Sequence, residues 1–165
     1  MSFLDSADDP KRAERWPLYY FLLASLAVGA AASLFTEPNL GWYASLARRP
    51  SFAPPVWLLA PVWTALYVLM AVAAWRAWKI TGLKSTAMVL YGLQLAFTFV
   101  WTALFFGPHQ IGLALDALGL LVLLRLITNF LFWWKDRWAG LLFLPVLGWA
   151  AFEAVLVYTF HALNP

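Results

Sequence analysis

The chain has 165 residues, of which 64% are hydrophobic and 12% are charged, and its formal net charge is +3. A soluble domain needs more charged surface than this, so the composition indicates an integral membrane protein. The small net charge argues against nucleic-acid binding, and the lack of cysteine excludes disulfides and thiolate chemistry.

The first sixteen residues carry both charge signs and no apolar core, which predicts a solvated N-terminal tail over residues 1–16. A short interfacial helix is the alternative for this tail, with Arg12, Arg15 and Trp16 against lipid headgroups. Residues 17–165 are expected to form one membrane domain without a second domain.

Five apolar segments follow, at about 17–35, 56–78, 86–106, 112–133 and 138–163. Their lengths approach or exceed what is needed to cross about 30 Å of hydrocarbon. Backbone amides in lipid must bond within their own segment, so each segment should be a helix. The predicted fold is therefore all-α, an integral membrane bundle of five transmembrane helices with a long, structured loop between the first and second.

Lysine and arginine predict the orientation of this bundle. The tail and the second and fourth connections hold eight of them, whereas the opposite side holds only Arg48 and Arg49. Because positive residues resist translocation, the N-terminus should be cytoplasmic and the C-terminus on the other side, as in a bacterial inner membrane.

Small residues predict where helices approach closely. Ser25, Gly29 and Ser33 form such a stripe on the first helix, which we assign to packing within the bundle. Gly92 and Ala96 form a shorter stripe on the third helix, and it serves either internal packing or a homodimer.

The loop between the first two helices is rich in aromatic residues and proline. Proline fixes φ and removes an amide donor, so Pro50, Pro54 and Pro55 should make its second half stiff. Trp42 and Tyr43 precede this stiff segment and would lie across the mouth of the bundle. An aromatic belt at the membrane interface is the alternative role for these rings.

Three blocks of residues support the first role. They are Trp42-Tyr43, Leu46, Pro50, Pro54-Pro55, Val62-Trp63, Leu66-Tyr67 and Met70; then Tyr91, Gln94-Leu95, Phe97, Trp101 and Phe105-Phe106-Gly107; then Trp138, Ala139, Leu142, Pro145, Trp149, Phe152 and Leu163-Asn164. In this order they resemble the TspO/MBR family of tryptophan-rich sensory proteins over roughly residues 17 to 165.

The resemblance implies a five-helix bundle, commonly dimeric, with an aromatic pocket that opens toward the long loop. It implies tetrapyrrole ligands such as porphyrin or haem and a role as sensor or carrier, with no required cofactor. Stacking on indole and phenol rings suits such flat ligands. Two alternatives stay open: a structural or assembly subunit that has lost the pocket and packs against another membrane complex, such as a pigment-protein assembly, and an enzyme that degrades porphyrin in light.

By the same resemblance, residues of this chain take roles in the pocket. The ligand-binding set is Trp63, Trp149, Tyr67, Trp101, Tyr43, Thr98 and Glu153, and the lid set is Trp42, Pro50, Pro54 and Pro55. Helix packing is the alternative role for each tryptophan.

The sequence departs from the family pattern at several positions. Phe52 stands where the family has tryptophan, Thr98 and Val157 where it has asparagine, and Val146 where it has tyrosine. Tyr158 is followed by no lysine or arginine, so the weak sterol-recognition pattern is missing and sterol binding is disfavoured.

Glu153 is the most consequential departure, because the family has a small residue there. A carboxylate inside a membrane bundle must be protonated, paired, hydrated or bound to something. The fourth helix adds Asp116, Arg125 and Asn129, and the last two share a face. Either Arg125 forms an ion pair with Glu153 or snorkels, or Glu153 changes the ligand by repelling an acidic porphyrin or by accepting hydrogen bonds from it.

Other chemistries have little support. His109 and His161 are the only histidines, and without cysteine or carboxylate spacing they predict no metal site. The sequence contains no phosphate-binding loop, nucleophile elbow or zinc-binding helix motif. We therefore assign no catalytic residue and do not expect a conventional enzyme.

Overall fold

The computed structural model describes residues 16–46 and 50–164, and within them the chain is helical with no strand. The five long helices are α2 (Trp16–Thr36), α4 (Val56–Thr81), α5 (Thr86–Phe106), α6 (Ile111–Lys135) and α7 (Arg137–Leu163). Each is long and apolar enough to cross a membrane. The predicted all-α fold with five transmembrane helices is confirmed. The expected tail lies outside the described residues except for Trp16, which begins α2, and so do Arg48 and Arg49.

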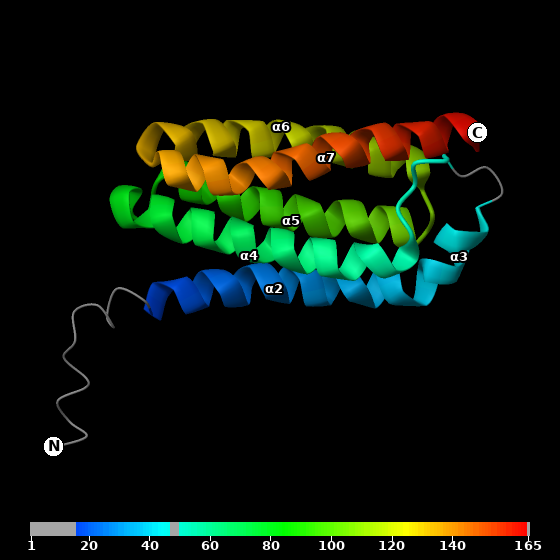
Figure 1. Cartoon of the computed structure of the whole chain (residues 1–165), viewed down its shortest axis with the longest axis horizontal. Coiled ribbons are helices and arrows are strands. Elements are labelled where there is room, and N and C mark those ends of the chain that lie inside the picture. Colours follow the sequence, from blue (N-terminus) through cyan, green and yellow to red (C-terminus); the bar gives the residue numbers. More distant parts are fainter. Residues whose placement is uncertain (1–15, 47–49, 165) are drawn as a thin grey trace, which may run out of the picture.

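The five helices form a closed ring around a shared interior. Helix α2 contacts α4 and α5, α4 contacts α7, α7 contacts α6, and α6 contacts α5. Figure 1 shows them running side by side along the long axis of the molecule. A ring of this kind leaves a central space that side chains from all five helices can reach.

The described part of the long connection is structured, as expected. Helix α2 continues into a 3-10 turn, η1 (Glu37–Asn39), and then into the short helix α3 (Leu40–Ser45). Tyr43 is only 2% exposed and its ring packs against those of Phe106 and Phe160. Trp42 stacks on His109 with ring centres 3.9 Å apart. Aromatic contacts thus hold α3 against one end of the bundle, which we call the loop end (Figure 1).

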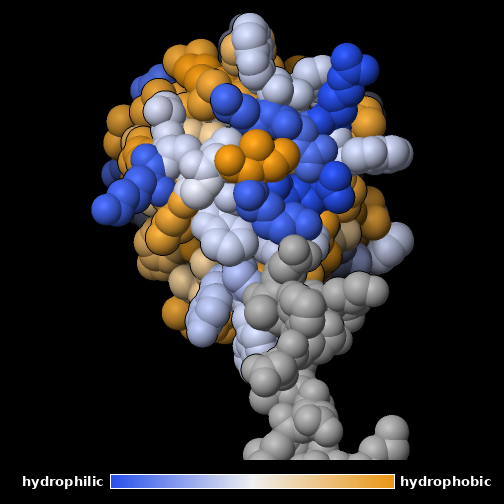
Figure 2. Space-filling view, turned by 90° about the vertical axis from the view of Figure 1, so that its left-hand side faces the viewer, coloured by the Kyte–Doolittle hydropathy of each residue, from blue (hydrophilic) through white to orange (hydrophobic). Residues whose placement is uncertain are grey.

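The opposite end carries the positive charge. Of the described lysines and arginines, all except Arg125 belong to the ends of α4, α6 and α7 that lie there or to the α4–α5 connection: Arg76, Lys79, Lys84, Lys135 and Arg137. We call this the basic end. Figure 2 views it directly and shows hydrophilic residues gathered over the helix termini, with apolar residues around the sides.

The interior is filled differently in its two halves. Toward the basic end, small side chains of α4, including Ala73, Ala74 and Ala77, pack with Phe132 and Phe143 and are fully buried. Toward the loop end, the core consists mainly of large rings from α3, α5 and α7 with aliphatic residues of α6. Small residues allow close helix approach, whereas large rings hold helices apart.

An ion pair closes the basic end. Arg76 Nε lies 2.8 Å from Asp136 Oδ2, and Asp136 also caps α7 by accepting a hydrogen bond from the Trp138 N–H at 2.9 Å. Partial burial would raise the pKa of the Asp136 carboxyl, but the interactions with Arg76 and with the backbone N–H groups outweigh burial and lower that pKa. The ionised carboxylate is therefore the form that stabilises the fold.

Asp136→Asn keeps a capping oxygen but removes the charge, so at neutral pH this variant should unfold at a lower temperature than the wild type in detergent. A carboxylate with a lowered pKa stabilises the fold above its unfolded pKa, about 3.9, and loses this effect as pH falls through the folded value. Thermal unfolding at neutral pH and at about pH 3 should therefore show the difference shrinking in acid. A difference that is the same at both pH values would contradict the role of the ion pair.

Candidate ligand-binding site

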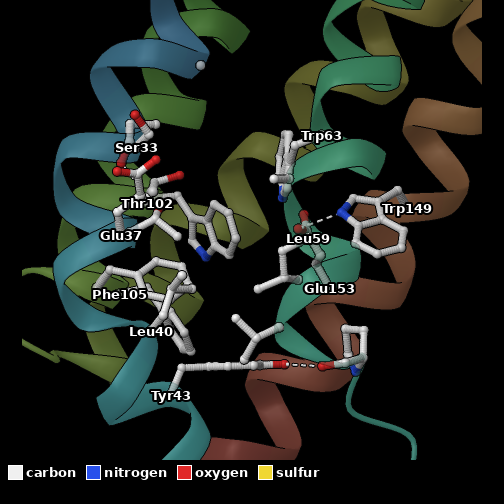
Figure 3. Close-up of a pocket in the computed structure, with 18 of the residues that line it drawn as sticks. Ser33, Glu37, Leu40, Tyr43, Leu59, Trp63, Thr102, Phe105, Trp149 and Glu153 are labelled. Atoms are coloured by element: carbon white, nitrogen blue, oxygen red, sulfur yellow. Dashed lines mark hydrogen bonds between the residues drawn. The ribbon is translucent and has the colours of Figure 1, made fainter.

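A cavity of about 220 Å³ lies inside the loop-end half of the bundle. Its walls come from the last turns of α2, the first turns of α4, the end of α5 and the middle of α7, and η1 and α3 close it (Figure 3). Helix α6 contributes none of the described residues that line it. The cavity is therefore placed where the predicted lid meets the bundle.

Indole rings from three helices line this cavity. Trp63 comes from α4, Trp101 from α5 and Trp149 from α7. The ring centres of Trp63 and Trp101 are 6.0 Å apart, and Tyr67, one turn after Trp63 on the same face, is 5.4 Å from it. Four predicted ligand-binding rings thus face one space. Figure 3 shows Trp63 and Trp149 on the same side of it.

The predicted lid residues separate into two groups. Tyr43 and Pro54 line the cavity, and the Tyr43 hydroxyl donates a hydrogen bond to the carbonyl oxygen of Pro54 at 3.3 Å, which links α3 to the segment before α4 (Figure 3). Trp42 stacks on His109 instead and is not among the lining residues. Pro50 is buried and Pro55 is the N-cap of α4, so both shape the loop without lining the cavity.

Helix α2 supplies lining residues that the sequence did not single out for this role. Gly29, Ala32, Ser33 and Thr36 line the cavity together with Glu37 of η1. At Gly29 an added Cβ would lie 2.6 Å from Cε2 of Tyr67, so that ring rests against the α2 backbone. The small side chains at positions 29 and 33 were the signal in the sequence for this role, because small residues occur where a cavity lies beside a helix as well as where two helices pack closely.

Glu153 points into the cavity with an incomplete set of hydrogen bonds. It is 4% exposed and lines the cavity. Trp149 Nε1 donates to its Oε1 at 2.7 Å, as Figure 3 shows. Its second oxygen, Oε2, is buried without a hydrogen-bond partner. A buried acceptor of this kind destabilises the fold until something donates to it.

Arg125 is bound by residues of α5 instead of by Glu153. The side chain is fully buried, and it donates from Nε to Gln94 Oε1 at 3.2 Å and from Nη2 to Thr98 Oγ1 at 3.0 Å. Its guanidinium carbon lies 5.7 Å from the centre of the Trp63 ring, a cation–π contact. The expected ion pair with Glu153 was wrong, because no nitrogen of Arg125 lies within 4.0 Å of a Glu153 oxygen. The snorkelling alternative was also wrong, because no part of Arg125 is exposed.

The remaining singled-out residues lie elsewhere. Thr98 is fully buried beneath the cavity, accepts from Arg125 and is not among the lining residues. Asp116 is exposed, and Asn129 is partly buried with an unpartnered Oδ1. Of the positions that depart from the family pattern, Val146 is in the core and Val157 lines the cavity.

Comparisons with known proteins agree with this architecture. Residues 21–163 match the model of the TspO/MBR family. The chain is 35% identical to a tryptophan-rich sensory protein of Cereibacter sphaeroides over 149 residues, which are 90% of this chain and 92% of that protein. It is 36% identical to the tryptophan-rich protein TspO of Archaeoglobus fulgidus over 147 residues, 87% of this chain and 94% of that protein. It is also 36% identical to the translocator protein of Homo sapiens over 147 residues, 86% of each chain. This chain is therefore an integral membrane protein of the TspO/MBR family, as the order of its aromatic and proline motifs indicated.

Proposed function

We propose that this protein is a membrane sensor or carrier that binds flat hydrophobic ligands, tetrapyrroles such as porphyrin or haem, in the cavity beneath α3. The observation that carries this proposal is the convergence of Trp63, Trp101 and Trp149 on one cavity under the lid. The names of similar proteins, which include sensory and translocator proteins, support a sensor or carrier role.

In this cavity, contacts between aromatic rings contribute more to the binding free energy of a ligand than the hydrophobic effect does. An apolar ligand already dissolves in the lipid, so burying it in a membrane protein gains little from the hydrophobic effect. Shape and stacking then decide which ligand is held, and aromatic pairs contribute roughly 1 kcal/mol each beyond area burial. A cavity walled by indole and phenol rings therefore favours flat conjugated molecules over lipid chains.

Trp63→Leu should weaken the binding of a neutral porphyrin, protoporphyrin IX dimethyl ester, by about three- to tenfold because one stacking surface is lost. The measurement is a titration of protein in lipid nanodiscs, followed by the porphyrin absorbance, with empty nanodiscs as the baseline. Trp134→Leu is the matched control, because Trp134 is 73% exposed and is not a lining residue.

Equal affinity in the wild type and Trp63→Leu would contradict the role of these rings. The alternative is an assembly subunit that retains the bundle without binding a ligand. Wild-type protein that binds no porphyrin and purifies with a stoichiometric membrane partner would support that alternative. The cavity favours the ligand-binding proposal, since a subunit with only a packing role has no use for a hollow lined by aromatic rings.

We propose further that the basic end faces the cytoplasm of a bacterial inner membrane and the loop end faces the opposite side. The gathering of Arg76, Lys79, Lys84, Lys135 and Arg137 at one end supports this orientation. Because the chain has no cysteine, single cysteines report the side directly. In intact cells an impermeant maleimide should label Ser51→Cys at the loop end and leave Leu83→Cys in the α4–α5 connection unlabelled; the reverse pattern would overturn the orientation.

We also propose a homodimer through α5. Gly92 and Ala96 are exposed on its outer surface, and a Cβ at Gly92 would meet nothing within 4 Å, so a second helix could approach there. Gly92→Leu should shift the protein from dimer to monomer in light scattering of the detergent-solubilised protein. Gly148→Leu on α7, where space is equally open, is the control and should leave the dimer intact. A monomeric wild type, or an unaffected Gly92→Leu dimer, would sink the proposal.

A further inference from the structure

One oxygen of the cavity wall is positioned for a hydrogen bond that no protein group makes. Trp149 Nε1 donates a hydrogen bond to Oε1 of Glu153 at 2.7 Å. Oε2 has no hydrogen-bond partner, although Glu153 is only 4% exposed. Buried acceptors in proteins are normally satisfied. In a cavity wall, a molecule that enters the cavity can supply the missing donor.

The charge of the wall indicates what kind of donor this is. Two carboxylates line the cavity, Glu153 deep in α7 and Glu37 in η1, where Figure 3 shows it near Ser33 and Thr102. Among the described lining residues there is no lysine, arginine or histidine to balance them. A ligand that carries carboxylates would therefore meet like charge, and a cationic one would meet opposite charge.

Arg125 does not provide the missing donor. It is bound to Gln94 and Thr98, it lies outside the lining, and it makes no contact ion pair with Glu153. Oε2 of Glu153 therefore has no donor among the described residues.

The aromatic walls also suit a cation. The faces of tryptophan and tyrosine rings attract ammonium groups, and the attraction increases when both are shielded from water. Trp63, Trp101, Tyr67 and Tyr43 surround the same space as Glu153. Rings and carboxylates together are what a flat ligand with a protonated amine requires.

We propose that Glu153, assisted by Glu37, makes this cavity prefer a flat aromatic ligand that bears a protonated amine over one that bears free carboxylates. The amine donates to Oε2 of Glu153 while the conjugated part of the ligand stacks on the indole rings. This inference rests on the proposed function, because it assumes that the cavity binds flat ligands, and it defines which chemical class of them is held.

The test uses three ligands with one macrocycle. They are protoporphyrin IX with two free carboxylates, its neutral dimethyl ester, and its diamide with two ethylenediamine arms, whose terminal amines are protonated at neutral pH. Each is titrated into the full-length protein in nanodiscs of phosphatidylcholine, a zwitterionic lipid that does not itself select by net charge, and empty nanodiscs give the background. The wild type should bind the diamine tightest and the dicarboxylate weakest, with roughly a ten- to hundredfold difference between them.

Glu153→Gln should reduce this ratio to within about threefold, because the amide keeps an acceptor for Trp149 but removes the charge. Glu37→Gln should reduce it less, because Glu37 is exposed and water and salt screen its charge. Asp116→Asn removes the same charge from an exposed site of α6 and should leave the ratio unchanged. If Glu153→Gln does not fold, the wild-type series and Glu37→Gln still decide the question.

The outcomes separate the two proposals. Binding of none of the three macrocycles above background would contradict the proposed function. Binding of all three with equal affinity, or tightest binding of the dicarboxylate, would leave the proposed function standing and overturn the selectivity. A diamine preference that persists in Glu153→Gln would assign the selectivity to another group and overturn the role of Glu153.

Discussion

The interior of this bundle depends on how the guanidinium group of Arg125 is accommodated. Burying a charged group without partners in a membrane protein costs several kcal/mol of folding free energy. The guanidinium group therefore needs interactions on more than one side. Gln94 and Thr98, one turn apart on α5, accept its hydrogen bonds, and Trp63 of α4 offers a ring face. These contacts hold three of the five helices together at mid-depth, where hydrophobic contacts alone do not fix the relative positions of helices in lipid.

This layer also separates two kinds of interior. On the side of the basic end, alanines such as Ala73 and Ala74 are fully buried and let α4 approach its neighbours closely. On the side of the loop end, rings such as Trp101 and Phe105 keep the helices apart, and a cavity remains between them. The protein thus combines a closely packed half toward the basic end with a half under α3 that contains the cavity.

The sequence predicted the helices and the aromatic walls well, because length and motif order carry that information. The largest difference in a helix end is at α4, which continues to Thr81 rather than stopping near residue 78. Trp63 and Trp149 could be assigned to one cavity because their motifs are specific. The partners of Arg125 could not be predicted. The position of Arg125 along the chain gives its depth in the membrane, but it does not give the rotation of α6 about its axis relative to α5. Thr98 was expected at the ligand; in the structure it binds Arg125 and is not among the lining residues. The contribution of α2 and η1 was missed, because Ser33 and Glu37 reach the cavity only through the ring arrangement of the helices.

The contact between Gly29 and Tyr67 has a consequence for how such a hollow can change over evolution. The tyrosine ring lies flush with α2 only because residue 29 has no side chain, and Cε2 would be 2.6 Å from a methyl group there. A methyl group at residue 29 would force the Tyr67 ring to shift and would change the shape of the chamber, with every aromatic wall residue retained. Ligand size could therefore be adjusted from a position that itself offers neither an aromatic surface nor a hydrogen bond to the ligand.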